Sequence, residues 1–333
     1  MALRERLFKA FHERNALQRH LARRVLFEVC QRLGLHVTGD HFYEIVPNTR
    51  LVAAQYSAAP RSLPGIDWRL RAGEARVLRL LAAYGAEYLA ASERFGFREK
   101  NHYFRGLDAL LLYLNVRDLK PGKIIEIGQG MSTRLILAAL ERNVQQTGQR
   151  ALLVSIDPYA RVAPPGVPDL ISLQIIQRPV QEVPMDPLLP GCGLLFVDSS
   201  HVHKFGSDVA WEFARLYPLL PPNTLLHLHD IFSPYDYPLE WIVKEKRFWN
   251  EQYVLEAFLM FNAAFAVELP VHLLARQSPA VREAVRRLPL DPRFEFSGSS
   301  FYLRRTEWAA PLPEPMPPSA VRADLPRAGN GSP

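Results

Sequence analysis

Cysteine is scarce in this sequence of 333 residues, which contains only Cys30 and Cys192. So few thiols argue against a disulfide framework and against a cysteine-ligated zinc site. No apolar run approaches the ~20 residues that a membrane-spanning helix needs. The N-terminal segment also lacks the apolar centre of a signal peptide. These absences predict a cytoplasmic protein without a transmembrane segment.

Charge is distributed unevenly along the chain. The formal net charge is +6, and residues 1–35 combine helical periodicity with many arginines. Such a helix could touch acidic lipid weakly, or it could simply present a solvated face, which is the commoner situation. We therefore expect no nucleic-acid partner, and a weak peripheral membrane contact stays open. The sequence predicts no oligomeric state.

Local patterns divide the chain into three parts. Residues 1–100 predict a cap segment of helices and loops, with one helical run at 74–92. Residues 101–308 alternate helical and strand patterns, and no repeat of solenoid length is present. Residues 309–333 are rich in Pro, Ala, Arg and Gly, a composition typical of a disordered tail.

The middle part predicts the fold. We expect helices at 108–119, 132–142 and 207–217. Strands are predicted at 123–127, 152–156, 171–176, 194–197, 225–229, 265–269 and 301–304. Strands that alternate with helices indicate an α/β fold, a doubly wound and mostly parallel sheet. Their nearly continuous apolar character fits a sheet that is covered on both faces.

Acidic residues follow several of these strands. Asp157, Asp198 and Asp230 each come directly after a predicted strand or at its end, and Glu126 lies in the first one. In a parallel sheet, ligands bind beyond the carboxyl ends of the strands. The sequence therefore predicts an acidic ligand site along one edge of the sheet.

A glycine turn follows the first strand. Gly128 and Gly130 would let a ligand approach bare backbone, and we expect a side chain at Gly128 to fill the ligand's space. A dinucleotide fingerprint requires a third glycine where Thr133 stands. A carboxylate before the first glycine also suits a cationic ligand better than a phosphate. S-adenosylmethionine is such a cation, and Asp157 would then accept hydrogen bonds from its ribose.

Four segments resemble class I S-adenosylmethionine-dependent methyltransferases, in particular the bacterial family 24-like group. They read IIEIGQGMST, SIDPYAR, FVDSSHVHKFGSDV and LLHLHDIFSPYDYP. The segment FGFREKNHYF before them, and RFWNEQYVLEAFLMFN and GSSFYLRR after them, resemble the same group, so the resemblance covers roughly residues 90–305. It implies a Rossmann-like methyltransferase fold with S-adenosylmethionine as cofactor. It implies cofactor binding by Glu126, Gly128, Gln129, Gly130, Ser132, Asp157 and Asp198.

Methyl transfer to oxygen requires removal of a proton from the acceptor, and two solutions are open. One is a histidine base, for which His201, His203 and His229 are candidates, with Asp230 beside His229. A hydrogen-bonded structural histidine is the alternative at each position. The other solution is Mg²⁺ held by Asp198 and Asp230, which correspond to positions of metal ligands in some related methyltransferases.

Aromatic residues between Tyr235 and Tyr253 predict a cover over the acceptor site or a packed helical layer. The resulting hypothesis is a methyltransferase acting on an oxygen of a sugar or secondary metabolite, a small-molecule acceptor. The alternatives are a non-catalytic module that binds S-adenosylmethionine and a nicotinamide-dependent oxidoreductase.

Overall fold

The computed structural model describes residues 27–37, 44–160 and 163–307. The predicted C-terminal tail, and residues 1–26 of the predicted N-terminal basic helix, lie outside these ranges. Among the described residues, no helix combines the length and apolar character that a membrane crossing requires.

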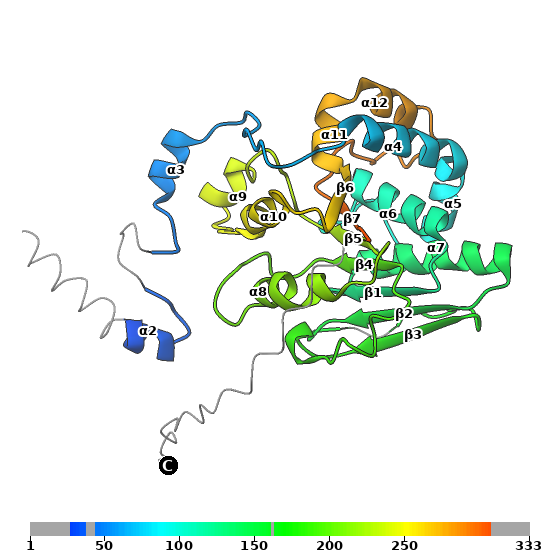
Figure 1. The fold of residues 1–333 in the computed structure, drawn as a ribbon, viewed down its shortest axis with the longest axis horizontal. Coiled ribbons are helices and arrows are strands. Elements are labelled where there is room, and N and C mark those ends of the chain that lie inside the picture. Colours follow the sequence, from blue (N-terminus) through cyan, green and yellow to red (C-terminus); the bar gives the residue numbers. More distant parts are fainter. Residues whose placement is uncertain (1–26, 38–43, 161–162, 308–333) are drawn as a thin grey trace, which may run out of the picture.

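A seven-stranded sheet forms the centre of the molecule (Figure 1). Its strands are β1 Lys123–Ile127, β2 Ala151–Ile156, β3 Ile171–Ile176, β4 Leu194–Val197, β5 Leu225–Leu228, β6 Phe265–Pro270 and β7 Phe301–Arg305. Their order is β3-β2-β1-β4-β5-β7-β6, and β7 runs antiparallel to both of its neighbours. All seven predicted strands are confirmed. The predicted strand at 225–229 ends one residue early, so His229 lies just beyond β5.

Helices cover both faces of the sheet. The helices of the described residues are α2 Phe27–Arg32, α3 Thr49–Gln55, α4 Leu70–Tyr84, α5 Tyr88–Ser92, α6 Gly106–Leu119, α7 Met131–Thr147, α8 Asp208–Trp211, α9 Leu239–Val243, α10 Glu251–Leu259, α11 Val271–Gln277 and α12 Pro279–Arg286. Of these, α2 and α3 have no buried residue and lie away from the sheet (Figure 1). Short 3₁₀ segments are η2 Gly85–Glu87, η3 Glu93–Phe95, η4 Val180–Glu182 and η6 Tyr217–Leu219, and η5 Glu212–Leu216 is a π-helix.

Two predicted helices are interrupted. The run predicted at 74–92 breaks at Gly85, where an added Cβ would lie 2.7 Å from the Leu288 side chain. Glycine therefore permits close packing against the segment after α12, and the chain turns there. The helix predicted at 207–217 widens into η5 after one α-helical turn.

Two apolar cores sandwich the sheet. The first joins α4, α5, α6, α7, α11 and α12 to one face, and the second joins α8, η5 and α10 to the other (Figure 1). The strands β1, β4 and β5 are almost entirely inaccessible, as their continuous apolar sequences require. The division at residue 100 stays a prediction, although α4 and α5 share the first core with α6 and α7.

The chain order creates the site at the carboxyl edge of the sheet. From β1 the chain first builds β2 and β3 on one side, and then crosses to β4 and β5 on the other. The order thus reverses between β1 and β4, and ligands bind at such a switch point in open α/β sheets. The turn after β1 and the loop after β4 meet there.

Candidate functional site

The turn between β1 and α7 contains Gly128 and Gly130, and the absence of a side chain has a different consequence at each position. Gly128 has φ +88°, and a Cβ on it would lie 2.2 Å from the carbonyl oxygen of Asp198. A side chain at Gly128 would therefore clash with the loop after β4. The prediction that it would fill the ligand's space is wrong. At Gly130 an added Cβ would meet no atom within 4 Å. Gly130 is thus the glycine that leaves open space.

Glu126 stabilises this turn through hydrogen bonds of its side chain. Its carboxylate is fully buried and accepts hydrogen bonds from the hydroxyls of Ser132 (2.8 Å), Thr133 (2.8 Å) and Ser155 (2.7 Å). Burial raises the pKa of Glu126 to about 7, although these three hydroxyls partly oppose the shift. Because it does not line the adjacent cavity, Glu126 acts on the shape of the turn.

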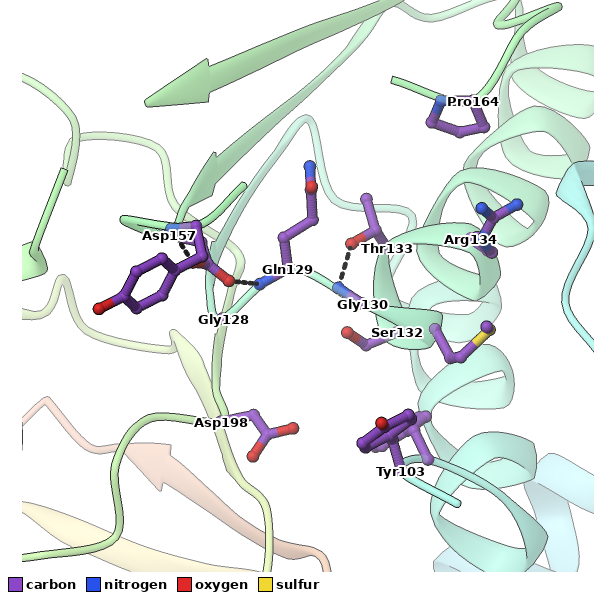
Figure 2. A pocket seen from close by; sticks show the side chains of 13 residues that line it. Tyr103, Gly128, Gln129, Gly130, Ser132, Thr133, Arg134, Asp157, Pro164 and Asp198 are labelled. Atoms are coloured by element: carbon purple, nitrogen blue, oxygen red, sulfur yellow. Dashed lines mark hydrogen bonds between the residues drawn. The ribbon is translucent and has the colours of Figure 1, made fainter. Parts of the chain in front are cut away.

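Asp157 is held in a defined orientation by backbone amides. One carboxylate oxygen accepts from the amide of Gln129 at 2.9 Å, and the other accepts from the amide of Tyr159 at 2.6 Å. Figure 2 shows the carboxylate beside the glycine turn. Each oxygen retains a lone pair for a further donor.

A first cavity of about 480 Å³ opens over this turn. Its lining includes every predicted cofactor residue except Glu126: Gly128, Gln129, Gly130, Ser132, Asp157 and Asp198. Sequence reasoning missed the aromatic walls, Tyr103, Phe104 and Tyr159. The first two lie in the segment NHYF, where only their proximity to the first motif could have indicated them.

A second cavity of about 600 Å³ adjoins the first, and the two share Tyr103 and Asp198. The predicted residues His201, His229 and Asp230 line it. Its lining also includes aromatic and basic side chains, among them Phe232, Trp241, Trp249, Arg105, Arg247 and His272. The guanidinium of Arg247 lies 4.6 Å from the Trp241 ring and 5.0 Å from the Trp249 ring. Part of the predicted aromatic cover therefore does face a cavity.

His201 is buried between carboxylates. Its Nδ1 lies 2.8 Å from Glu251 and its Nε2 lies 3.1 Å from Asp198. Burial disfavours the charged imidazole, but the hydrogen bonds to Asp198 and Glu251 outweigh it and raise the pKa of His201 to about 10. The sequence did not single out Glu251, which is the first residue of α10.

His229 has a similar environment. Its Nδ1 lies 3.5 Å from Asp198 and 3.6 Å from Asp230, and its Nε2 lies 3.6 Å from Asp108. Burial again disfavours the charge, but the neighbouring Asp230 and Asp198 carboxylates hold the pKa of His229 well above its usual range. Burial also opposes ionisation of Asp198, yet the charge of His229 and the bond to His201 hold that pKa well below normal.

The other two histidines near the site differ from this pair. His227 is fully buried in β5, where its Nε2 lies 2.7 Å from the Ser300 hydroxyl and burial lowers its pKa to about 3. It is a structural histidine. His203 is exposed and lines neither cavity. The structure thus brings His201 and His229 together with Asp230, and leaves the predicted candidate His203 outside.

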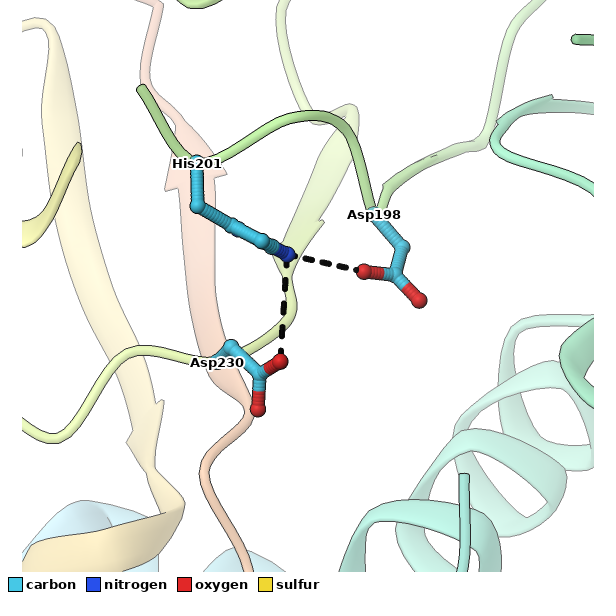
Figure 3. Close-up of side chains that lie close together, drawn as sticks. All are labelled: Asp198, His201 and Asp230. Carbon is cyan, nitrogen blue, oxygen red and sulfur yellow. Dashed lines mark hydrogen bonds and ion pairs between the residues drawn. The ribbon is translucent and has the colours of Figure 1, made fainter. Parts of the chain in front are cut away.

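The two predicted metal residues do converge. Asp198, His201 and Asp230 each place one ligand atom within 4.8 Å of the others (Figure 3). The additional donors at this point are imidazole nitrogens, whereas Mg²⁺ prefers oxygen.

Comparisons with known proteins found one family model and several solved structures. Residues 125–231 match a family model described as a methyltransferase domain. The SAH-bound methyltransferase PaMTH1 of Podospora anserina is 15% identical, with 78% of this chain and 94% of that chain covered and a TM-score of 0.35. The plantazolicin methyltransferase BpumL in complex with SAH is 12% identical, with coverages of 69% and 99% and a TM-score of 0.34. No curated protein matches the chain.

Proposed function

We propose that this chain, a class I S-adenosylmethionine-dependent methyltransferase with a Rossmann-like fold, methylates an oxygen of a small-molecule acceptor such as a sugar or secondary metabolite. The observation that carries the proposal is the junction of two cavities at Asp198 and Tyr103. The first cavity is lined by residues of the segment that resembles the first methyltransferase motif. The second is lined by titratable side chains. A donor and an acceptor bound in the two would meet at that junction.

The first cavity fits the cofactor. Its volume of about 480 Å³ is in the range of small-molecule sites. The open space at Gly130 admits a ligand close to the backbone, and the fixed Asp157 carboxylate suits a ribose diol. When bound, S-adenosylmethionine supplies the methyl group. The chain contributes the positioning, which can lower the barrier by about 7–11 kcal/mol.

The second cavity suits a polar acceptor with a flat face. Trp241, Trp249 and Phe232 offer rings for stacking, and Arg105 and Arg247 offer hydrogen-bond donors. The absence of a nucleic-acid partner and the cytoplasmic location stay predictions.

The acceptor's proton would pass to the cluster at the junction. The Asp230 carboxylate lines the acceptor cavity beside His229, and we assign Asp230 to receive the proton. The pKa of His229 is raised, so its charged imidazole would orient that carboxylate. His201 is held by Glu251 and Asp198 on its two ring nitrogens, so we assign it to hold Asp198 in position. His203 has no part in this proposal. Mg²⁺ has none either, because only two of the side chains that converge here offer oxygen.

Calorimetric titration with S-adenosylhomocysteine and with NAD⁺ tests the cofactor. We expect the chain to bind S-adenosylhomocysteine and not NAD⁺. Asp157→Ala should lower the affinity for S-adenosylhomocysteine about 10–100-fold, because a hydrogen bond to a charged group contributes about 1.5–3 kcal/mol. Asp157→Asn retains one acceptor oxygen and serves as the matched variant, with a smaller loss. Binding of NAD⁺ without S-adenosylhomocysteine would favour the oxidoreductase alternative and end the proposal.

Turnover separates the enzyme from a non-catalytic binding module. A panel of hydroxylated acceptors with labelled S-adenosylmethionine should yield a methylated product. His229→Ala should then reduce the rate while affinity for S-adenosylhomocysteine stays within a few-fold of wild type, since His229 lines only the second cavity. Tight cofactor binding with no turnover on any acceptor would support the module.

A further inference from the structure

One wall of the second cavity is a row of adjoining rings that begins at the junction. The ring centroid of Trp249 lies 4.3 Å from that of His201, which contacts Asp198. The Trp241 ring lies 5.2 Å from the Trp249 ring at an angle of 77°, and Phe232 continues the row at 5.3 Å from Trp241. All of these side chains line the cavity. A flat acceptor therefore has a ring surface that leads away from the reacting end.

A tight turn after α9 folds Arg247 back onto this row. Lys246 has φ +59°, and the amide of Arg247 donates to the carbonyl of Trp241 at 2.9 Å. The guanidinium consequently lies over two rings, 4.6 Å from the centroid of Trp241 and 5.0 Å from that of Trp249. A cation–π contact uses no hydrogen-bond acceptor, so the five N–H donors of the guanidinium still need partners.

Glu245 meets only part of that need. Its carboxylate lies 2.7 Å from Nη2 of Arg247, and the side chains of Arg247 and Glu245 are 40% and 39% exposed. Within the described ranges, Nε and Nη1 of Arg247 have no hydrogen-bond acceptor. Because an exposed ion pair contributes little stability, a ligand that carries negative charge can replace Glu245 or bind beside it.

The three carboxylates in the lining have partners of their own. Asp108 accepts hydrogen bonds from two backbone amides before β7. Asp198 and Asp230 both face Nε2 of His201 (Figure 3) and Nδ1 of His229. The pKa values of both histidines are raised, so their imidazoles are charged at neutral pH. Two carboxylates and two imidazolium groups therefore balance beside the junction, and they leave the arginine charge available to a ligand.

We propose that the methyl acceptor carries an oxyanion, a carboxylate or a phosphate group, and that Arg247 is the specificity-determining residue that binds it. The planar guanidinium matches two oxygens of such a group, and Trp241 and Trp249 offer their rings to the flat part of the same molecule. Arg105, which pairs with exposed Glu295 at 3.1 Å, supplies a second cation to the same cavity. The role of the oxyanion in methyl transfer rests on the proposed function, but its binding does not.

Matched ring compounds test this preference on the full wild-type chain. The probes para-hydroxybenzoate, para-hydroxyphenyl phosphate and neutral para-hydroxybenzamide share a hydroxylated ring and differ in one group. By calorimetry, at least one of the two anions should bind about tenfold or more tightly than the amide, and the tighter anion identifies the oxyanion. Added NaCl should reduce the preference, because salt screens exposed charges. Equal affinities, or no detectable binding of either anion up to its solubility, would overturn the proposal.

Variants assign the preference to one residue. In Arg247→Gln, the affinity for the anion should fall to within about two- to threefold of that for the amide, whose own affinity should change little. Arg247→Lys keeps the charge without the planar fork, so it should retain part of the preference. An undiminished preference in Arg247→Gln would contradict the assignment.

Arg94→Gln is the matched control. Arg94 also lies over an aromatic ring, 4.7 Å from the centroid of Phe95, and also pairs with a glutamate, Glu141, at 3.2 Å. It lines neither cavity, so its variant should prefer the anion as the wild type does. An equal decrease in the control and in Arg247→Gln would refute the role of Arg247.

Titration of S-adenosylhomocysteine into the same wild-type sample separates this proposal from the proposed function. Cofactor binding without a preference for the anion ends only the oxyanion proposal. A preference for the anion without cofactor binding ends only the proposed methyl transfer. Because both measurements use the wild-type chain, they decide the matter even where a variant fails to fold.

Discussion

Glu126 illustrates how burial alters the role of a single carboxylate. The sequence suggested a direct charge interaction with a cationic ligand, but the side chain is enclosed by three hydroxyls beneath the glycine turn. Its raised pKa of about 7 means that the group is only partly ionised at neutral pH. Its contribution at the residue scale is therefore the geometry of the turn, and its charge is secondary.

Glu126 should make stability depend on pH. The unfolded chain releases this proton near 4.5, whereas the folded chain keeps it until about 7, so folding is progressively disfavoured as pH rises between these values. Relative to Glu126→Gln, the wild-type free energy of unfolding should fall by about 3 kcal/mol across that window. Urea unfolding of both proteins at each end of the window measures the change. A difference that is independent of pH would contradict the raised pKa.

The β1–α7 connection is the element on which the cofactor site depends. Its glycines look equivalent in the sequence, yet only Gly130 borders open space, whereas Gly128 is pressed against the carbonyl of Asp198. Hydrogen bonds stabilise the same turn at two places. Asp157 accepts from the amide of Gln129, and Glu126 accepts from the hydroxyls of Ser132 and Thr133. One short connection therefore combines a close backbone approach with a rigid support.

Substitutions at the two glycines should separate binding from folding. Gly130→Val should reduce affinity for S-adenosylhomocysteine more than about tenfold, since its side chain enters the cavity, with little change in melting temperature. Gly128→Ala should destabilise the fold by at least about 1–2 kcal/mol, because φ is +88° and the carbonyl of Asp198 blocks the Cβ. Calorimetry and thermal denaturation distinguish the two. Similar stability losses in both variants would show that the open space at Gly130 is absent.

On the scale of the whole molecule, Asp108 joins distant parts of the chain. This residue in the first turn of α6 accepts hydrogen bonds from the amides of Ser299 (2.9 Å) and Ser300 (2.7 Å), which precede β7. It also faces His229 beyond β5. A single buried carboxylate thus connects the beginning of the sheet domain to its last strand and to the site.

Asp108→Ala should lower the free energy of unfolding by about 3–5 kcal/mol, since it leaves two buried amides and Nε2 of His229 without their charged partner. Asp108→Asn keeps an acceptor oxygen, so its free energy of unfolding should fall by less. The control is Glu283→Ala in the exposed pair with Arg287 on α12, where about 0–1 kcal/mol is expected. Comparable losses at Asp108 and Glu283 in urea unfolding would contradict the connecting role.

The sequence by itself determined the alternation of strands and helices, the glycine turn and the acids at the strand ends. Each of these is a local pattern, set by side-chain periodicity or by backbone requirements over a few residues. It did not reveal that α4 and α5 join the first core, because only packing against α6, α7 and β6 shows that.

Tertiary structure alone decided which polar groups meet. Glu251 lies 50 residues from His201, and Asp108 lies far from His229, so no spacing rule could pair them. Of the three candidate histidines, His203 became an exposed residue and His201 and His229 face Asp198, whereas the nearby His227 became a core residue. Burial and charge at the reversal of strand order, which exist only in the folded chain, produced that difference.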